Sequence, residues 1–229
     1  TSGGTARYAI YFAPPRESAW WTFGCAWLGR DPITDARMAW PALDTLGAPR
    51  LSHITSAPRR YGFHATLKPP FRLATGRGAK DLYQQAAKLA ASLTPVTLPP
   101  LRLTEIDGFV ALSFAGESEG ASHCNAIAAQ CVSYLDHFRA PADAAELARR
   151  QVSGLSVRQG QLLAAWGYPY VFEDFRFHLT LTGRLSRVER HHVIDVLTPV
   201  VQTLQTEPLP FDALALYVQP QPEAPFRGI

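Results

Sequence analysis

The sequence predicts an α+β fold made of two pseudo-symmetric lobes, each a mostly antiparallel sheet covered by helices, with a central cleft between them. The first observation is a repeat, since residues 63–67 and 177–181 both read F-H-x-T-L. The second is that each repeat is followed by a helix-patterned segment and a further strand, which is a weak internal symmetry. We therefore take residues 1–229 as one bilobal domain with intertwined lobes, whose motif strands lie near 61–68 and 175–182.

The first part of the chain alternates strand and helix patterns. Residues 7–13 alternate large apolar and smaller side chains, which predicts a half-buried strand. A tryptophan-rich stretch near 20–28 has helical character, and a proline-rich, irregular segment follows it as far as Pro58. After the first motif strand, we expect Pro69 and Pro70 to end the pairing because proline cannot donate to a sheet ladder.

The middle of the chain predicts a helix, a hairpin and a second helix. Apolar residues at helical spacing over residues 78–93 indicate a helix with one side packed on a sheet. Residues 101–106 and 109–114 give the clearest hairpin signal, because the Asp-Gly pair between them accepts positive φ in a tight turn. A second helix is expected over residues 122–138.

The last part of the chain contains the second motif strand between two helical regions. The segment 139–174, mostly helical in pattern, is either a lid over the cleft or scaffold between the lobes. Ser186 with Glu189 three residues later is a capping box that marks the start of a long helix. A final strand is expected over residues 214–219.

Composition indicates a globular protein. Hydrophobic residues make up 47% of the chain, yet no apolar run approaches the length of a membrane span and no leader sequence opens the chain. The three cysteines have no C-x-x-C spacing, which fits a reducing cytoplasm. A net charge of +3 suits a small anionic ligand better than a long nucleic-acid groove. We expect a cytoplasmic protein that needs neither a membrane nor an obligate protein partner.

The motif residues divide cleanly between the two faces of their strands. Side chains alternate along a strand, so polar residues and glycine fall on one face and apolar residues on the other. The residues expected on the polar face are Gly62, His64, Thr66 and Lys68 in the first strand, and Arg176, His178, Thr180 and Thr182 in the second.

This polar face has the chemistry of a phosphate site. One imidazole of a pair can take a proton while the other gives one, because the ordinary pKa of histidine is near 6.5. Hydroxyl and cationic donors around the pair would hold a tetrahedral anion. The face offers no carboxylate, so we predict no metal and no cofactor. The plainer alternative is two amphipathic core strands with exposed polar edges. A third H-x-T, at residues 53–55, reads as loop and is interpreted as a chance match.

The two motifs, His64-Ala65-Thr66-Leu67 and His178-Leu179-Thr180-Leu181, resemble those of the two-histidine (2H, LigT-like) phosphoesterases. Residues 59–71 and 166–170 are similar, more narrowly, to an uncharacterised subfamily often encoded beside bacterial phosphonate-degradation genes. The resemblance implies an enzyme, a metal-independent hydrolase of phosphodiesters. It implies that His64 and His178 exchange protons with water and the leaving oxygen.

The same resemblance implies the roles of the residues around the histidines. Thr66 and Thr180 would bind the non-bridging oxygens, and Lys68 and Arg176 would stabilise the charge of the transition state. From its position before the first motif strand, Arg60 would either reach the cleft or remain a solvated surface charge. Tyr11 would stack on a sugar or base, or serve only packing.

The subfamily also implies a substrate. Carbon–phosphorus bond cleavage leaves 5-phosphoribosyl 1,2-cyclic phosphate, whose ring must be opened, and Arg59, Arg60 and Arg72 are expected to meet its second phosphate. The expected partner is thus a small phosphorylated sugar or nucleotide. The alternatives are RNA processing, at 2′,5′ linkages or 2′,3′-cyclic ends, and a non-catalytic nucleotide or RNA binder. A non-catalytic binder would not need two histidines.

Overall fold

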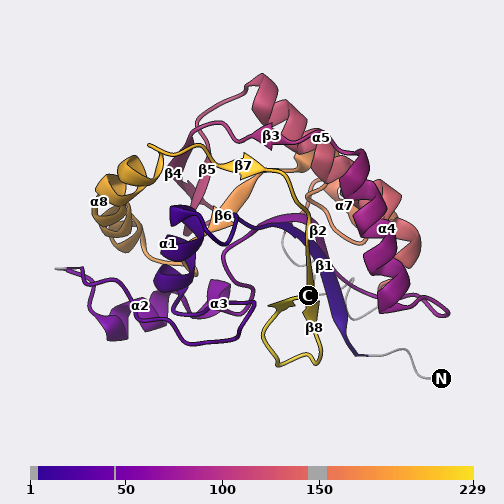
Figure 1. Ribbon diagram of the computed structural model, residues 1–229, viewed down its shortest axis with the longest axis horizontal. Helices are drawn as coiled ribbons and strands as arrows, with labels where there is room; N and C mark the ends of the chain where they lie inside the picture. The colour runs from indigo at the N-terminus through magenta and orange to yellow at the C-terminus, as the bar shows by residue number, and fades with distance from the viewer. Residues whose placement is uncertain (1–4, 44, 144–153) are drawn as a thin grey trace.

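The computed structural model describes residues 5–43, 45–143 and 154–229 and shows an α+β protein built on a large antiparallel sheet (Figure 1). Neighbouring strands of this sheet pair antiparallel. In their order across the sheet, the seven strands are β4 (Leu101–Ile106), β5 (Phe109–Phe114), β6 (His178–Thr180), β2 (Ala65–Arg72), β1 (Arg7–Phe12), β8 (Ala215–Gln219) and β9 (Arg227–Gly228).

The two motif strands are neighbours within this sheet. Strands β2 and β6 pair directly, with Ala65 opposite Leu179. The strands expected in two separate lobe sheets therefore join into one sheet, with β5 and β4 continuing beyond β6 and with β1, β8 and β9 continuing beyond β2. A second, two-stranded sheet pairs β3 (Val96–Thr97) with β7 (Pro210–Phe211).

Helices cover one face of the large sheet, where they bury the main hydrophobic core. Figure 1 shows α4 and α5 side by side at one end and α8 at the other. Ile10 and Leu179 are among the strand residues that face this core. The helical elements are α1 (Ala19–Leu28), α2 (Ala48–Ile54), α3 (Ser56–Arg59), α4 (Ala79–Ser92), α5 (Glu119–Tyr134), α7 (Val157–Trp166) and α8 (Arg187–Leu204), with 3-10 turns η1 (Asp136–Phe138) and η2 (Phe172–Asp174).

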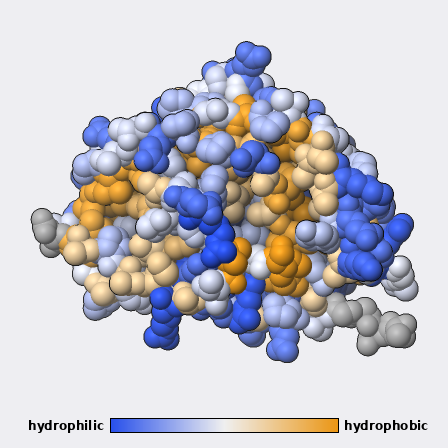
Figure 2. Space-filling model, viewed as in Figure 1, coloured by the Kyte–Doolittle hydropathy of each residue, from blue (hydrophilic) through white to orange (hydrophobic). Residues whose placement is uncertain are grey.

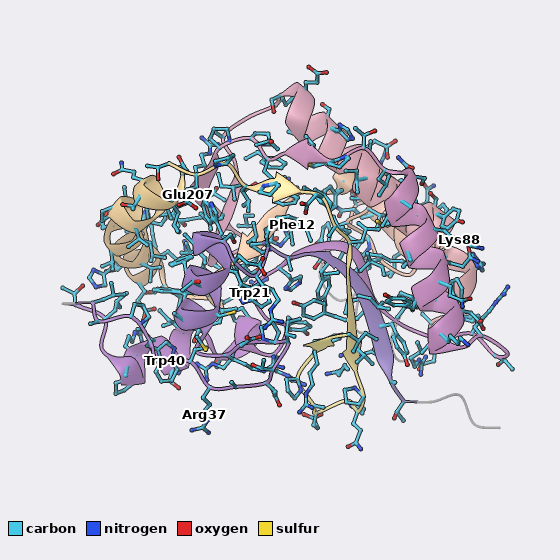
Figure 3. The ribbon with its side chains drawn as sticks, in the orientation of Figure 1. Phe12, Trp21, Arg37, Trp40, Lys88 and Glu207 are labelled. Carbon is cyan, nitrogen blue, oxygen red and sulfur yellow. The ribbon has the colours of Figure 1, made fainter. Side chains whose placement is uncertain are left out.

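The distribution of side chains follows this layering. In Figure 3, Phe12 lies inside the molecule whereas Lys88 and Glu207 point outward, in agreement with their burial. The outer surface of α4 is hydrophilic in Figure 2, as expected for a helix with one apolar side. A much smaller cluster lies on the opposite face of the sheet and consists of Ala9, Tyr11, Tyr217 and Phe226.

Several expected elements are confirmed with close boundaries. The hairpin runs over Leu101–Ile106 and Phe109–Phe114, and Asp107 and Gly108 both take positive φ in its turn. The capping box at the start of α8 is formed in both directions, between Ser186 and Glu189. Of the segment 139–174, residues 144–153 lie outside the described residues.

Two expectations about the region before and within β2 are wrong. The irregular segment before Pro58 contains α2 and α3, so the third H-x-T lies on a helix and its end rather than in a loop. Strand β2 also runs through Pro69 and Pro70. Its pairing with β6 is confined to Ala65, so this side of β2 needs no donor at the prolines.

No helix in the described part of the chain is both long enough and apolar enough to span a membrane.

Candidate active site

The structure brings both H-x-T motifs to the same face of the sheet, opposite the face that α4, α5 and α8 cover. Because Ala65 is opposite Leu179 in an antiparallel pair, the register sets Thr66 opposite His178 and His64 opposite Thr180. The two histidines are therefore diagonal neighbours, and diagonal pairs on one face lie about 7–8 Å apart. Such a spacing leaves room between the rings for one tetrahedral anion.

Both histidines are held by the same local hydrogen bond. His64 Nδ1 lies 2.9 Å from the carbonyl oxygen of Gly62, and His178 Nδ1 lies 2.7 Å from that of Arg176. A carbonyl accepts but cannot donate, so each Nδ1 carries the proton in the neutral ring. The Nε2 atom is consequently the one left for chemistry in each ring. His64 Nε2 lies 3.1 Å from the Thr66 hydroxyl, which donates to it in the neutral ring.

Burial depresses the basicity of both rings. It lowers the pKa of His64 to about 4, with the charge of His178 acting in the same direction and the Gly62 carbonyl opposing it. Burial also lowers the pKa of His178. The hydrogen bond to the Arg176 carbonyl and the charge of Asp107 raise it, whereas the charge of the Arg176 guanidinium lowers it. The effect of His178 on the pKa of His64 agrees with two imidazoles that lie close together.

The side chain of Tyr11 packs against the ring of His64. Its ring stacks on that of His64 with centroids 3.7 Å apart and planes 27° apart. Tyr11 is fully buried and packs against Tyr217 in the small cluster on this face. The structure thus brings Tyr11 to the site, but as a support for His64 rather than as an exposed platform for a sugar or base.

Two adjoining hollows lie over the motif strands. One, of about 600 Å³, is lined by His178 and Arg176. The other, of about 460 Å³, is lined by His64 and Thr180. Each is of the size usual for small-molecule sites. Five residues line both hollows: Thr66, Pro69, Phe109, Tyr168 and Arg184.

The structure does not bring Lys68 to this site. The pairing of β1 with β2 shifts register on both sides of Ile10, and Lys68 is opposite Ile10, whose side chain lies in the main core. Lys68 therefore points toward the helices and is only 2% exposed. Its Nζ donates to Asp136 Oδ1 at 3.0 Å and to the Val132 carbonyl at 3.1 Å. The simple alternation along β2 failed because the strand is irregular beyond Leu67.

The arginines expected to meet a second phosphate are also elsewhere. Arg60 donates to the Pro222 carbonyl and lies 4.0 Å from Glu223, outside both hollows. Arg59 donates to backbone carbonyls, including that of Leu28, and Arg72 pairs with Asp143. These side chains hold loops and helices together.

Cations of the site come partly from positions that sequence reasoning missed. Arg176 lines the hollow of His178, as its alternation with that residue predicts. Arg184 lines both hollows and Arg7 lines that of His64, although neither belongs to a motif. Only the strand pattern around Arg7 offered a signal, since Arg7 and Tyr11 are an even number of positions apart. Tyr168 was within a stretch noted for its resemblance but had no assigned role.

Carboxylates near His178 were missed as well. Asp107, Glu173 and Asp174 line its hollow, and Arg158 pairs with both Glu173 and Asp174. Within the described residues, no group of three or more histidine, cysteine, aspartate or glutamate side chains is arranged to hold a metal ion.

A protein-family model described as "Protein of unknown function (DUF1045)" matches residues 66–227, which is well over half of the chain. The chain belongs to the DUF1045 family. The match begins at Thr66, so it includes the second H-x-T motif and only the end of the first.

Two curated relatives of this DUF1045 chain carry one name, "Ribose 1,5-bisphosphate phosphokinase PhnN". The protein of Janthinobacterium sp. (strain Marseille) is 38% identical over 232 residues, which cover 99% of this chain and 50% of that protein. The protein of Laribacter hongkongensis (strain HLHK9) is 36% identical over 228 residues, which cover 96% of this chain and 50% of that protein. The DUF1045 chain thus spans about half the length of these relatives.

Proposed function

We propose that this protein is a phosphodiesterase of the two-histidine (2H, LigT-like) type that opens a cyclic phosphate on a ribose-type small molecule without a metal ion. The observation that carries the proposal is the pairing of β2 with β6, which sets two identically tethered imidazoles diagonally on one face. Each presents Nε2 toward a hollow of small-molecule size.

The geometry supports a particular division of labour between the histidines. A pKa of about 4 keeps His64 neutral, so its Nε2 is available to accept a proton from water. Burial also lowers the pKa of His178, but there the Arg176 carbonyl and the charge of Asp107 favour the protonated ring. We therefore assign His64 as general base and His178 as general acid.

The reaction then balances in one displacement. His64 takes a proton from water as the water oxygen forms a bond to phosphorus. The bond between phosphorus and one ring oxygen breaks, and that oxygen leaves with the proton of His178. The product is a phosphate monoester with a free sugar hydroxyl, and proton exchange with solvent restores both rings.

The neighbouring donors would stabilise the charge that grows on the phosphoryl oxygens. Thr66 and Thr180 lie opposite the two histidines in register, so their hydroxyls are within the same small area of the sheet. Arg176 supplies positive charge beside His178 and has no ion-pair partner among the described residues. The lysine expected in this role, Lys68, is instead paired with Asp136.

The names of the relatives favour a phosphorylated ribose as the substrate. The relatives are about twice as long as this chain, and we assign the phosphokinase of their name to the half that this chain does not match. The chain contains no Gly-Lys pair and hence no G-x-x-x-x-G-K-[ST] phosphate loop. In agreement with the resemblance to phosphonate-associated proteins, we propose 5-phosphoribosyl 1,2-cyclic phosphate as the substrate.

The test is a comparison of cyclic phosphates with a chelator present throughout. Hydrolysis of 5-phosphoribosyl 1,2-cyclic phosphate and of a 2′,3′-cyclic nucleotide is followed by ³¹P NMR. We expect ring opening of both and a preference for the former. Failure to open either ring would contradict the proposed function, and preference for an RNA end, with binding that weakens steeply with salt, would favour RNA processing instead.

A further inference from the structure

We propose that Arg7 and Arg184 form a subsite for a second phosphoryl group of the substrate, in the hollow that contains His64. This inference rests on the proposed function, which supplies the first phosphoryl group between the histidines. Arg7 and Arg184 take the place of the arginines expected at the second phosphate. Those arginines lie outside the two hollows over the motif strands or are engaged in other contacts; they are Arg59, Arg60 and Arg72.

The two hollows differ in charge, and the difference selects the His64 side. The hollow of His178 carries three carboxylates, Asp107, Glu173 and Asp174, together with Arg176 and the shared Arg184. The hollow of His64 carries Arg7 and Arg184 and has no carboxylate among its lining residues. A phosphate dianion is repelled by the carboxylates of the first hollow, whereas in the second hollow it meets arginines without opposing carboxylates. The carboxylates are suited instead to accept hydrogen bonds from sugar hydroxyls.

Arg7 is held in place without losing its charge. Its Nε donates to Gln219 Oε1 at 2.7 Å, and its guanidinium lies 5.5 Å from the centre of the Phe226 ring. Gln219 is itself fixed, since its Nε2 donates to the carbonyls of Pro222 and Ala224 at 2.9 and 2.8 Å. The amide is neutral, so the remaining guanidinium N–H groups keep a full positive charge for an anion.

Arg184 is positioned through its backbone neighbours. The N–H of Gly183 donates to the Ile54 carbonyl at 2.7 Å, and that of Leu185 donates to the Gly108 carbonyl at 2.8 Å. The stem of Arg184 lies over the hairpin turn, where a Cβ at Gly108 would be 4.0 Å from Arg184 Cγ. Among the described residues, neither Arg184 nor Arg7 has a carboxylate partner. Two pre-positioned arginines without a counter-ion are typical of phosphate recognition.

The kinetic experiment compares two substrates in three proteins. Arg184→Gln is measured beside the wild type, and Arg187→Gln is the matched control because Arg187 is exposed and lines neither hollow. The readout is the ratio of kcat/KM for 5-phosphoribosyl 1,2-cyclic phosphate to that for ribose 1,2-cyclic phosphate. Arg184→Gln is expected to lower this ratio about 10- to 100-fold, as for loss of a charged hydrogen bond, whereas Arg187→Gln keeps it. Equal losses on both substrates would overturn the subsite.

A binding experiment separates this inference from the proposed function. Calorimetry with ribose 5-phosphate and with ribose needs no turnover. The wild type is expected to bind ribose 5-phosphate more tightly, and both Arg7→Gln and Arg184→Gln are expected to remove most of that difference. The subsite stands if this result is obtained even where no cyclic phosphate is hydrolysed. Equal affinity of the wild type for both sugars contradicts it.

Discussion

The two F-H-x-T-L stretches have the same sequence pattern but different surroundings. The first belongs to β2, an eight-residue strand, and its His64 is stacked on buried Tyr11 and in contact with the Thr66 hydroxyl. The second belongs to β6, a three-residue strand, and its His178 stands beside Arg176 and Asp107. The tether from Nδ1 to the carbonyl two residues earlier is common to both.

In the proposed reaction, one local motif supplies two chemical roles. The motif fixes which nitrogen faces the ligand, because the tether joins the histidine to the residue two positions earlier in the chain. The tertiary surroundings then set the basicity of that nitrogen: burial lowers the pKa of both rings, and the charge of Asp107 opposes this effect at His178. An acid and a base can thus arise from a repeated sequence.

The largest expected effect comes from removing either ring. His64→Asn and His178→Asn should each lower kcat at least 100-fold, because a general acid or base contributes about 10²- to 10⁴-fold. His53→Asn is the matched control, since it alters the third H-x-T, which lies on α2. Near-normal turnover of either motif variant, with an unchanged Tm, would contradict the assignment of both rings to one reaction.

The second prediction separates the two cations that alternation placed on the same face. Arg176→Gln should lower kcat/KM about 10- to 100-fold with little change in Tm, because it removes an exposed charge beside the reacting group. Lys68→Met should instead lower the free energy of unfolding by about 1–3 kcal/mol, since the Val132 carbonyl loses its donor. Asp136 keeps its two bonds from Arg139. Both variants are measured by kinetics and by chemical denaturation. Loss of activity in a stable Lys68→Met variant, or loss of stability in Arg176→Gln, would contradict these roles.

The third prediction concerns the two threonines. Thr66→Val and Thr180→Val should each lower kcat/KM about tenfold, as expected for a lost hydrogen bond to a charged oxygen. Only Thr66→Val should also raise the pKa of its histidine, because the Thr66 hydroxyl donates to the neutral form of His64. The pH dependence of kcat/KM distinguishes the two variants, and identical profiles would show that the Thr66 contact has no influence on His64.

The smallest expected effect is a change in pH dependence. In the wild type, kcat/KM should rise as the pH increases through about 4, where His64 loses its proton and becomes a base. It should fall at higher pH as His178 loses the proton it must donate. Asp107→Asn removes a charge that raises the pKa of His178, so this basic limb should move to lower pH while the acid limb stays. Movement of the acid limb alone would reverse the assignment of base and acid.

Much of the local structure could be predicted from the sequence because local signals determine it. The turn at Asp107–Gly108 and the cap at Ser186 depend on residues within a few positions of one another. The face shared by His64 and Thr66 needed only the alternation of a strand. The repetition indicated that the two motif strands build one site, but their direct pairing was not predicted, because the internal symmetry favoured two separate lobe sheets.

What could not be predicted depends on contacts between distant segments. Lys68 left the expected face because the register of β1 against β2 shifts at Ile10, and no signal for this shift is visible in β2 itself. Arg7 and Arg184 reach the hollow of His64 from the N-terminal strand and from the segment after β6. Their place follows from the order of strands in the sheet, which the sequence does not specify.

The central claim is that both imidazoles contact one phosphoryl group, and NMR of the histidine rings tests it most directly. Ring carbon signals of His64 and His178, assigned with the Asn variants, are followed as inorganic phosphate is added. Both signals should shift with the same saturation curve, and the pKa of each ring should rise because the bound anion favours the charged form. A response from one ring only, or two different saturation curves, would show that the histidines serve separate sites.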